Sequence, residues 1–393
     1  MKSDPGPILF FVHTLPAGGL PRIMAQEIIH LRTMGAKVTC SALSRSDAPY
    51  LDALIQELGI NGHLDVRRHS VSAHRREATL ERLRVSDYPL RLTDVLRTFA
   101  CYVRATPSVA ICHELKAAVL SLPFLFLFRV KLITVLHDNP LAFARCNTDV
   151  RGLKDRLIIA IGKLLGLIAL RFSKVVVATS QKIADDLRNA ASFRNIRVIP
   201  LGIELSQRRR AWSDREGLLT VATWGPDRNP EWYLDLAEKL SEDVQFTFVG
   251  HWKDQASRDR FLFNRRSRRL EQRIRVLEDV SDEDLRELYD TSLAFVRFGF
   301  DEHGTGQGVT EALGSGCPVT INESLGASAI VVNHVHGLVF KDGATPSAVA
   351  EGMMGLIGDK ASWAQMSDAC VNLARHFSWA AHSEGLYRLI VQS

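Results

Sequence analysis

The densest group of reactive side chains in this 393-residue sequence is DEHGTGQGVTE, residues 301–311. It follows an apolar run, SLAFVRF (292–298), and opens a helical pattern. Alternate glycines leave backbone amides uncovered at the start of that helix, where they can bind phosphate oxygens. The carboxylate of Glu311, one turn into the helix, can accept hydrogen bonds from sugar or ribose hydroxyls. We therefore expect a diphosphate-binding loop here, although a tight turn with a solvated glutamate would have the same composition.

Three other polar side chains follow predicted strands, which is where open α/β sheets bind ligands. Arg228 comes after LLTVATW, and a fixed cation there would stabilise negative charge on a diphosphate. His113 ends VAICH and His137 ends LITVLH, so each ring can hydrogen-bond a substrate. A purely structural role for each histidine is equally compatible with the sequence. Neither histidine has a metal-ligand spacing such as H-E-x-x-H, and we expect no metal.

The first apolar run, ILFFVH, is followed by a loop that ends in Gly18 and Gly19. Glycines between a strand and a helix let a ligand approach the backbone and the first amides of the helix. The full G-x-G-x-x-G fingerprint is missing, which argues against a nicotinamide-dependent oxidoreductase.

Composition and charge further restrict the functional classes to which the protein can belong. The net charge of +5 suits anionic ligands, and the six cysteines have no metal or redox spacing. Basic runs at 207–210 and 264–269 lack interleaved aromatic residues, so we expect no nucleic-acid binding. Arg129 and Lys131 interrupt the longest apolar stretch, 118–136, and the start of the chain lacks the apolar region of a secretory signal. A cytoplasmic location is the expectation.

Short apolar runs alternate with longer helical patterns, which predicts parallel sheets covered by helices. A charged stretch without periodicity separates two such series. The predicted fold class is α/β, with two Rossmann-like parallel-sheet domains facing across a cleft. The tail, 344–391, has a helical pattern. The expected parts are a first domain, a linker, a second domain and a C-terminal helix packing back on the first domain, over residues 1–202, 203–217, 218–375 and 376–393.

Several segments together resemble the retaining, nucleotide-sugar-dependent glycosyltransferases of GT-B fold, the family-4-like group 1 enzymes. VIPLGIE (198–204) is similar to the segment that joins the family's two domains. VATWGPDRNPEWYLDLAEKL resembles the start of its donor domain, and HGTGQGVTEALGSGCPVTI resembles its donor-site motif. GLVF (337–340) and FSWAAHSEGLYRL also fit, so the likeness covers nearly the whole chain.

The resemblance implies roles for residues at matching positions. Glu311 would hold the nucleotide ribose, and Arg228 would replace a family lysine beside the diphosphate. His113 would lie near the reacting sugar carbon. The remaining implied contacts come from the donor loop and the acceptor-side loop: Gly304, Gly306, Gln307 and Thr310 in the former, and Gly18, Gly19 and His137 in the latter.

Three positions depart from the family's pattern. His303 occupies the place of the first glutamate of the paired donor motif, with Glu302 immediately before it, so either side chain would grip the donor sugar. Thr223 replaces the family's diphosphate arginine, which would make Arg228 more important. Ala329 stands where many members have glutamate. These departures leave room for an unusual donor or for lost activity.

The resemblance implies a hexosyltransferase that moves a hexose-type sugar from a UDP- or GDP-sugar, with retention of configuration and without a metal or other cofactor. The acceptor would be a saccharide, a lipid-linked molecule or a small molecule. Two alternatives stay open: a nucleotide-sugar epimerase of the same architecture, and a catalytically inactive sugar-nucleotide-binding protein. The basic, apolar segment 153–172 is compatible with peripheral contact to an anionic membrane, or with a core helix.

Overall fold

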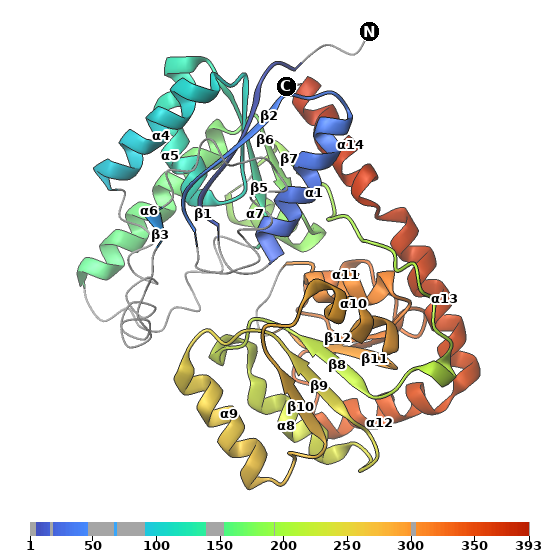
Figure 1. Ribbon diagram of the computed structural model, residues 1–393. Coiled ribbons are helices and arrows are strands. Elements are labelled where there is room, and N and C mark those ends of the chain that lie inside the picture. The colour runs from blue at the N-terminus through green and yellow to red at the C-terminus, as the bar shows by residue number, and fades with distance from the viewer. Residues whose placement is uncertain are drawn as a thin grey trace. The chain divides into compact units, whose positions relative to one another are not determined.

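The computed structural model describes residues 5–15, 19–45, 67–68, 91–138, 153–191, 193–299 and 304–392. The chain divides into two compact units (Figure 1). Unit 1 comprises Met1–Leu201 and Trp379–Ser393, and unit 2 comprises Gly202–Ser378. The chain therefore returns to unit 1 after it has passed through unit 2.

Unit 1 is built on a seven-stranded sheet with the order β3-β2-β1-β4-β5-β6-β7, in which all neighbouring strands are parallel. Ile8 of β1 lies beside Val38 on one side and Val109 on the other. The elements of unit 1, in chain order, are β1 (Ile8–Leu15), α1 (Gly19–Thr33), β2 (Val38–Arg45), β3 (Arg67–Arg68), α4 (Leu92–Ala105), β4 (Val109–Cys112), α5 (Leu115–Phe128), β5 (Lys131–Leu136), α6 (Leu153–Phe172), β6 (Val175–Ala178), α7 (Gln181–Ala191), β7 (Ile196–Val198) and α14 (Trp379–Gln392).

The strands of unit 1 are continuous apolar runs because helices cover both faces of a parallel sheet. Side chains alternate along β1, so that Phe10 packs in a cluster with α1 while Phe11 packs in a second cluster with α5. Leu386 and Ile390 of α14 belong to the cluster of Phe10. A helix from far along the chain thus completes the core of unit 1.

Unit 2 contains a six-stranded parallel sheet with the order β10-β9-β8-β11-β12-β13. The predicted α/β class is therefore confirmed in both units. The elements of unit 2, in chain order, are η1 (Trp212–Asp214), β8 (Leu218–Val221), η2 (Pro226–Arg228), α8 (Pro230–Lys239), β9 (Phe246–Val249), α9 (Gln255–Ser267), β10 (Ile274–Leu277), α10 (Asp282–Thr291), β11 (Ala294–Arg297), α11 (Gln307–Gly314), β12 (Val319–Asn322), η3 (Gly326–Ala329), β13 (Gly337–Phe340), α12 (Pro346–Gly358) and α13 (Lys360–His376).

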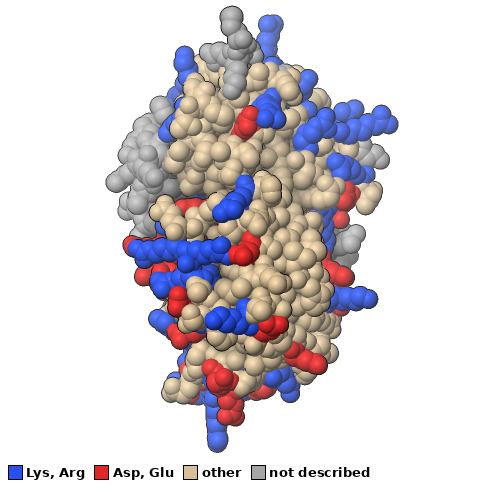
Figure 2. Space-filling view, turned by 90° about the vertical axis from the view of Figure 1, so that its right-hand side faces the viewer, with Lys and Arg blue, Asp and Glu red and all other residues tan. Residues whose placement is uncertain are grey.

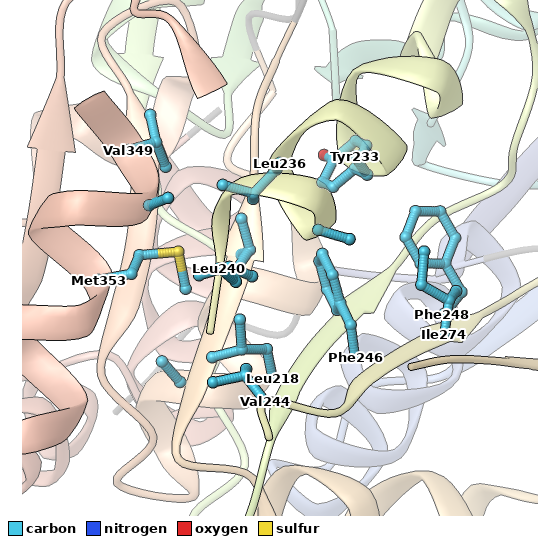
Figure 3. Close-up of a cluster of buried hydrophobic side chains, with 14 of the residues drawn as sticks. Leu218, Tyr233, Leu236, Leu240, Val244, Phe246, Phe248, Ile274, Val349 and Met353 are labelled. Carbon is cyan, nitrogen blue, oxygen red and sulfur yellow. The ribbon is translucent and has the colours of Figure 1, made fainter. Parts of the chain in front are cut away.

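Side chains from α8 and α12 fill one face of this second sheet (Figure 3). Tyr233 and Leu236 of α8 pack with Met353 of α12 and with the strand residues Leu218 and Phe246. The helical tail of the sequence is divided into three helices. Asp359 begins α13 because its carboxylate accepts hydrogen bonds from the first backbone amides of that helix.

The segment predicted as a linker, residues 203–217, is anchored within unit 2. Arg215 is buried, and its guanidinium donates to the carbonyl oxygens of Tyr289 (3.1 Å), Ser292 (3.1 Å) and Ser315 (2.6 Å). A buried cation needs such acceptors to offset the loss of water. The segment is therefore part of the packed structure of unit 2.

In each sheet the first strand of the unit lies in the interior. The chain first adds strands on one side of it and then returns to add strands on the other side. β1 is flanked by β2 and β4, and β8 is flanked by β9 and β11. The connections that leave the carboxyl ends of β1 and β4 run to opposite sides, as do those that leave β8 and β11. Parallel α/β sheets bind ligands where neighbouring connections diverge in this way.

The close approach of α11 to the backbone of Glu204, within unit 2, generates a test of packing. A Cβ at Gly314 would collide with the carbonyl oxygen of Glu204, whereas a Cβ at Gly355 in α12 would meet nothing within 4 Å. We expect Gly314→Ala to lower the free energy of unfolding by about 1–3 kcal/mol. Gly355→Ala should raise it by up to about 1 kcal/mol, because alanine favours helix. Denaturant titration measures both, and equal effects of the two substitutions would contradict this packing.

Candidate functional site

The loop after β8 carries Thr223 and Arg228. Trp224 fixes this loop, since its buried indole N–H donates to the carbonyl of Val249 at 3.0 Å. The backbone N–H of Arg228 donates to the carbonyl of Gly225 at 2.9 Å and closes the short helix η2. Thr223 is exposed and Arg228 is half-buried. The sequence-predicted cation therefore follows the carboxyl end of β8, one of the two strands at the divergence in unit 2.

The loop after β11, the other strand at this divergence, leads into α11. Gly306 has a φ of 74° and is the N-cap of α11, which has no side-chain cap and no acidic residue in its first turn. A positive φ favours glycine. A helix start without a cap leaves its first amides available to an anion. Gly304, in the same loop, is buried, and its carbonyl accepts a hydrogen bond from the backbone N–H of Gly326 at 3.0 Å.

The other predicted donor-loop residues have separate positions on α11. Gln307 is the first residue of the helix. Thr310 is buried, and its hydroxyl donates to the carbonyl of Gln307 at 2.8 Å. Glu311 is half-buried one turn into the helix. Glu302 and His303 lie outside the described residues, as does Gly18 of the first loop.

Two polar residues of this region were not singled out from the sequence. Asn322, the last residue of β12, accepts from the backbone N–H of Gly299 and donates to its carbonyl, both at 2.8 Å, and thereby fixes the chain just after β11. Arg297, the last residue of β11, is buried and donates to the carbonyl of Phe298 at 2.9 Å. A polar residue ending an otherwise apolar strand was the available sequence signal for both.

In unit 1, the two predicted histidines contact each other. Nδ1 of His113 lies 3.0 Å from Nε2 of His137, and Nε2 of His113 lies 3.0 Å from Oε2 of Glu27, outside ideal hydrogen-bond alignment. The side chains of His113 and Glu27 are both fully buried, whereas His137 is half-buried. Both ring nitrogens of His113 are thus occupied by protein groups. Gly19 begins α1, the helix that carries Glu27.

The same carboxylate reaches the C-terminal helix. Oε1 of Glu27 lies 2.8 Å from Nε2 of His382 in α14, and Nδ1 of His382 donates to the carbonyl of Pro200 at 2.7 Å. A continuous row of polar groups therefore runs from Pro200 through His382, Glu27 and His113 to His137; we name it the histidine row. Glu27 and His382 were not predicted from the sequence, although a carboxylate inside the apolar segment IMAQEIIHL was a signal.

Burial and charge act in opposite directions on this row. Burial by itself would raise the pKa of Glu27, but the neighbouring His113 and His382 overcome it and hold that pKa below its usual range. Burial opposes the charged form of His382, yet the hydrogen bond and charge of Glu27 raise its pKa. Burial lowers the pKa of His137 to about 3. His137 is therefore neutral at physiological pH, while Glu27 and His382 form an ion pair.

Other kinds of site find little support in the described part of the chain. No group of three or more histidine, cysteine, aspartate or glutamate side chains there has the geometry of a metal site. None of its helices has the length and apolarity of a membrane span. On the face shown in Figure 2, positive and negative side chains are interspersed, and the described residues form no continuous basic stripe.

Two family models match successive parts of the chain. Residues 17–207 match Glycosyltransferase Family 4, and residues 204–376 match Glycosyl transferases group 1. Together the two matches span residues 17–376, and they make the chain a group 1, family-4-like glycosyltransferase. The family resemblance inferred from the sequence motifs is thereby confirmed. No curated protein matches the sequence.

Solved structures share the fold of this chain. Anabaena HepE in complex with UDP and glucose is 16% identical, with a TM-score of 0.77 over 98% of this chain and 100% of that chain. Sucrose-phosphate synthase from Thermosynechococcus elongatus is 16% identical, with a TM-score of 0.75 over 98% of both chains. S. aureus TarM is 12% identical, with a TM-score of 0.68 over 98% of this chain and 99% of that chain. The glycosyltransferase has the GT-B fold.

The pKa of His137 predicts a pH dependence of stability. Its pKa falls from 6.5 to about 3 on folding, and that of His13 falls to about 4 because of burial. Below pH 6.5 these two histidines bind protons in the unfolded chain but not in the folded chain. Acidification therefore lowers the free energy of unfolding by about 1.4 kcal/mol per pH unit for each histidine. We expect His137→Gln to remove one such contribution between pH 6.5 and 5, measured by denaturant titration. Parallel slopes for His137→Gln and the unsubstituted protein would contradict the burial of this ring.

Proposed function

We propose that this glycosyltransferase moves a hexose-type sugar from a nucleoside-diphosphate donor to a hydroxyl acceptor with retention of configuration. The observation that carries the proposal is the divergence in the sheet of unit 2, where the uncapped N-terminus of α11 and the loop of Arg228 follow adjacent strands. Helix amides and a guanidinium are the groups that bind a diphosphate. HepE is described in complex with UDP-glucose, and TarM in complex with UDP, which favours a uridine donor here.

Each donor-site residue has a proposed role. The amides of Gly306 and Gln307 bind the diphosphate, and Arg228 stabilises the charge that develops on it as the sugar leaves. Glu311 binds the ribose hydroxyls. Glu302 or His303 holds hydroxyls of the donor sugar. Gly304 and Thr310 shape the loop, since Thr310 uses its hydroxyl within α11.

The reaction needs no cofactor in this proposal. The acceptor oxygen forms a bond to the anomeric carbon, and the bond between that carbon and the diphosphate breaks. The departing phosphate oxygen takes the proton of the acceptor hydroxyl, so the products are the glycoside and a nucleoside diphosphate. The protein positions the reactants and stabilises charge, and unit 1 supplies the acceptor side with Gly18, Gly19 and the two histidines.

Two alternatives make different predictions. A nucleotide-sugar epimerase would convert the donor without any acceptor. An inactive sugar-nucleotide-binding protein, which His303 and Thr223 would suit, would bind the nucleotide without turnover. Release of UDP that depends on an added acceptor excludes both.

Nucleotide binding is the first test of the donor site. A ligand at about a hundred times its dissociation constant adds roughly 2.7 kcal/mol of stability. Among UDP, GDP, ADP, TDP and NAD, we expect UDP alone to raise the melting temperature. Arg228→Ala should weaken this shift by at least about tenfold in apparent affinity, because a charge-assisted contact is lost. Arg266→Ala, at an exposed arginine of α9, is the control; a shift with NAD alone would refute the donor site.

We further propose that unit 1 contacts an anionic membrane surface, which favours a lipid-linked acceptor. Ten large apolar side chains of α4, α5 and α6 are exposed: Leu92, Leu96, Phe99, Val103, Phe126, Leu127, Leu157, Ile161, Leu164 and Phe172. Ring contacts join the three helices that carry them: Phe99 of α4 lies 5.9 Å from the half-buried Phe128 of α5, and Phe126 of α5 lies 5.5 Å from Phe172 of α6, between ring centres. Contiguous exposed apolar surface of this kind marks an interaction site. We name it the apolar face.

The charges around the apolar face suit anionic lipid. Exposed arginines on or next to the same three helices are Arg91, Arg104, Arg129 and Arg171. The one acidic residue of α4, Asp94, is buried. Each basic side chain near an anionic bilayer contributes about 1 kcal/mol. Apolar and basic groups together are what an interfacial helix needs.

Vesicle binding tests the apolar face. We expect the triple variant Leu96→Gln, Phe126→Gln, Ile161→Gln to reduce partitioning to phosphatidylserine-containing vesicles by at least about tenfold, because less apolar surface enters the lipid. Phe263→Gln removes an equally exposed side chain from α9 of unit 2 and is the matched control. Sedimentation with vesicles at low salt measures both. Equal binding by the two variants would rule out docking through this face.

A further inference from the structure

The hydrogen bonds of the histidine row determine which of its atoms donate and which accept. A carbonyl oxygen only accepts, so the contact with Pro200 places a proton on Nδ1 of His382. The carboxylate of Glu27 also only accepts when ionised, so Nε2 of His382 carries a second proton. His382 is therefore the imidazolium that balances the negative charge of Glu27.

The balance of charge in this buried site then determines which nitrogens of His113 and His137 carry protons. A second imidazolium at His113 would leave an uncompensated positive charge in a fully buried site, which is strongly disfavoured. A neutral His113 directs its one N–H, on Nε2, toward Oε2 of Glu27, because a lone pair there would be repelled by the carboxylate. Its Nδ1 then accepts from Nε2 of His137. The proton of His137 is on Nε2, and its Nδ1 bears a lone pair.

The end of the row lies at the sheet edge. His137 directly follows β5, whose carboxyl end lies beside that of β4. Nδ1 of His137 is buried and has no hydrogen-bond partner among the described residues. A buried acceptor without a partner is rare in proteins, and a bound ligand is one way in which it is satisfied.

We propose that Glu27 and His382 are positioning residues, which hold His137 through His113 in a single tautomer so that Nδ1 accepts a hydrogen bond from a hydroxyl of a bound sugar. The inference rests on the proposed function for the identity of the ligand. Stacking of His113 on Phe10, with ring centres 5.3 Å apart, keeps the middle ring of the row in place. The C-terminal helix α14 thereby acts on the ligand-binding edge of unit 1 without touching the ligand.

Nitrogen NMR of the full-length protein labelled with ¹⁵N-histidine tests the assignment directly. We expect His137 to show a protonated Nε2 and an unprotonated Nδ1, its signals being identified by their loss in His137→Gln. A proton on Nδ1 would overturn the proposal, and this measurement does not depend on whether the enzyme turns over.

Substitutions test the positioning role through catalysis. Glu27→Gln keeps the shape of the side chain but removes its charge, and we expect UDP release from UDP-glucose to fall at least about tenfold in kcat. Glu27→Asp retains a carboxylate and should recover part of this loss. His382→Gln should show the same loss in kcat, and it provides a second test in case Glu27→Gln does not fold. Glu384→Gln, at an exposed residue of α14, is the matched control.

Thermal stabilisation by UDP separates this inference from the donor site. UDP should stabilise Glu27→Gln as much as the unsubstituted protein, because the proposed donor residues lie in unit 2. Unchanged kcat in Glu27→Gln and His382→Gln would overturn the positioning role while leaving the donor site intact. Failure of UDP to stabilise the unsubstituted protein would refute the donor site. The tautomer of His137 would still test the positioning role of Glu27 and His382.

Discussion

The position of the first strand inside each sheet is the constraint on which the candidate site depends. Because β8 lies between β9 and β11, the chain leaves β8 toward one side of the sheet and later leaves β11 toward the other. Side chains and backbone amides at the two strand ends are then not covered by a common helix. The loop of Arg228 and the start of α11 occupy this position in unit 2. The end of β4, with His113, occupies the equivalent position in unit 1.

A buried carboxylate imposes a second constraint, in unit 1. Glu27 lies on the apolar side of α1 and has no access to water. The cost of removing a charge from water is offset here by the imidazolium of His382 and the ring N–H of His113. Replacing the pair by apolar side chains would satisfy the core equally well. The ordering of two further histidines is what the ion pair adds, and such specificity is a known use of buried polar groups.

Much of the fold and part of the site could be predicted from the sequence. Continuous apolar runs separated by helical patterns indicated parallel sheets, and the family-specific motifs indicated the glycosyltransferase; both predictions are confirmed. The alternate glycines of residues 304–308 predicted uncovered amides at the start of a helix, and Gly306, with a positive φ, is the N-cap of α11. Local patterns could not reveal that Glu27 pairs with His382, since 355 positions separate them along the chain. They also could not reveal that Arg215 is buried, because its carbonyl acceptors, Tyr289, Ser292 and Ser315, lie more than 70 positions further along the chain. For His113 the sequence left a structural and a functional role open, and its role in the reaction stays a prediction.

The return of the chain to unit 1 through α14 has a consequence for synthesis on the ribosome. Unit 2 is one continuous stretch and can collapse as soon as it leaves the exit tunnel, whereas unit 1 lacks part of its core until the whole of unit 2 has been made. During that interval the carboxylate of Glu27 has no imidazolium beside it, and the apolar surface that α14 later covers stays accessible to water and to chaperones. We therefore expect unit 1, most of which is synthesised first, to complete its folding last.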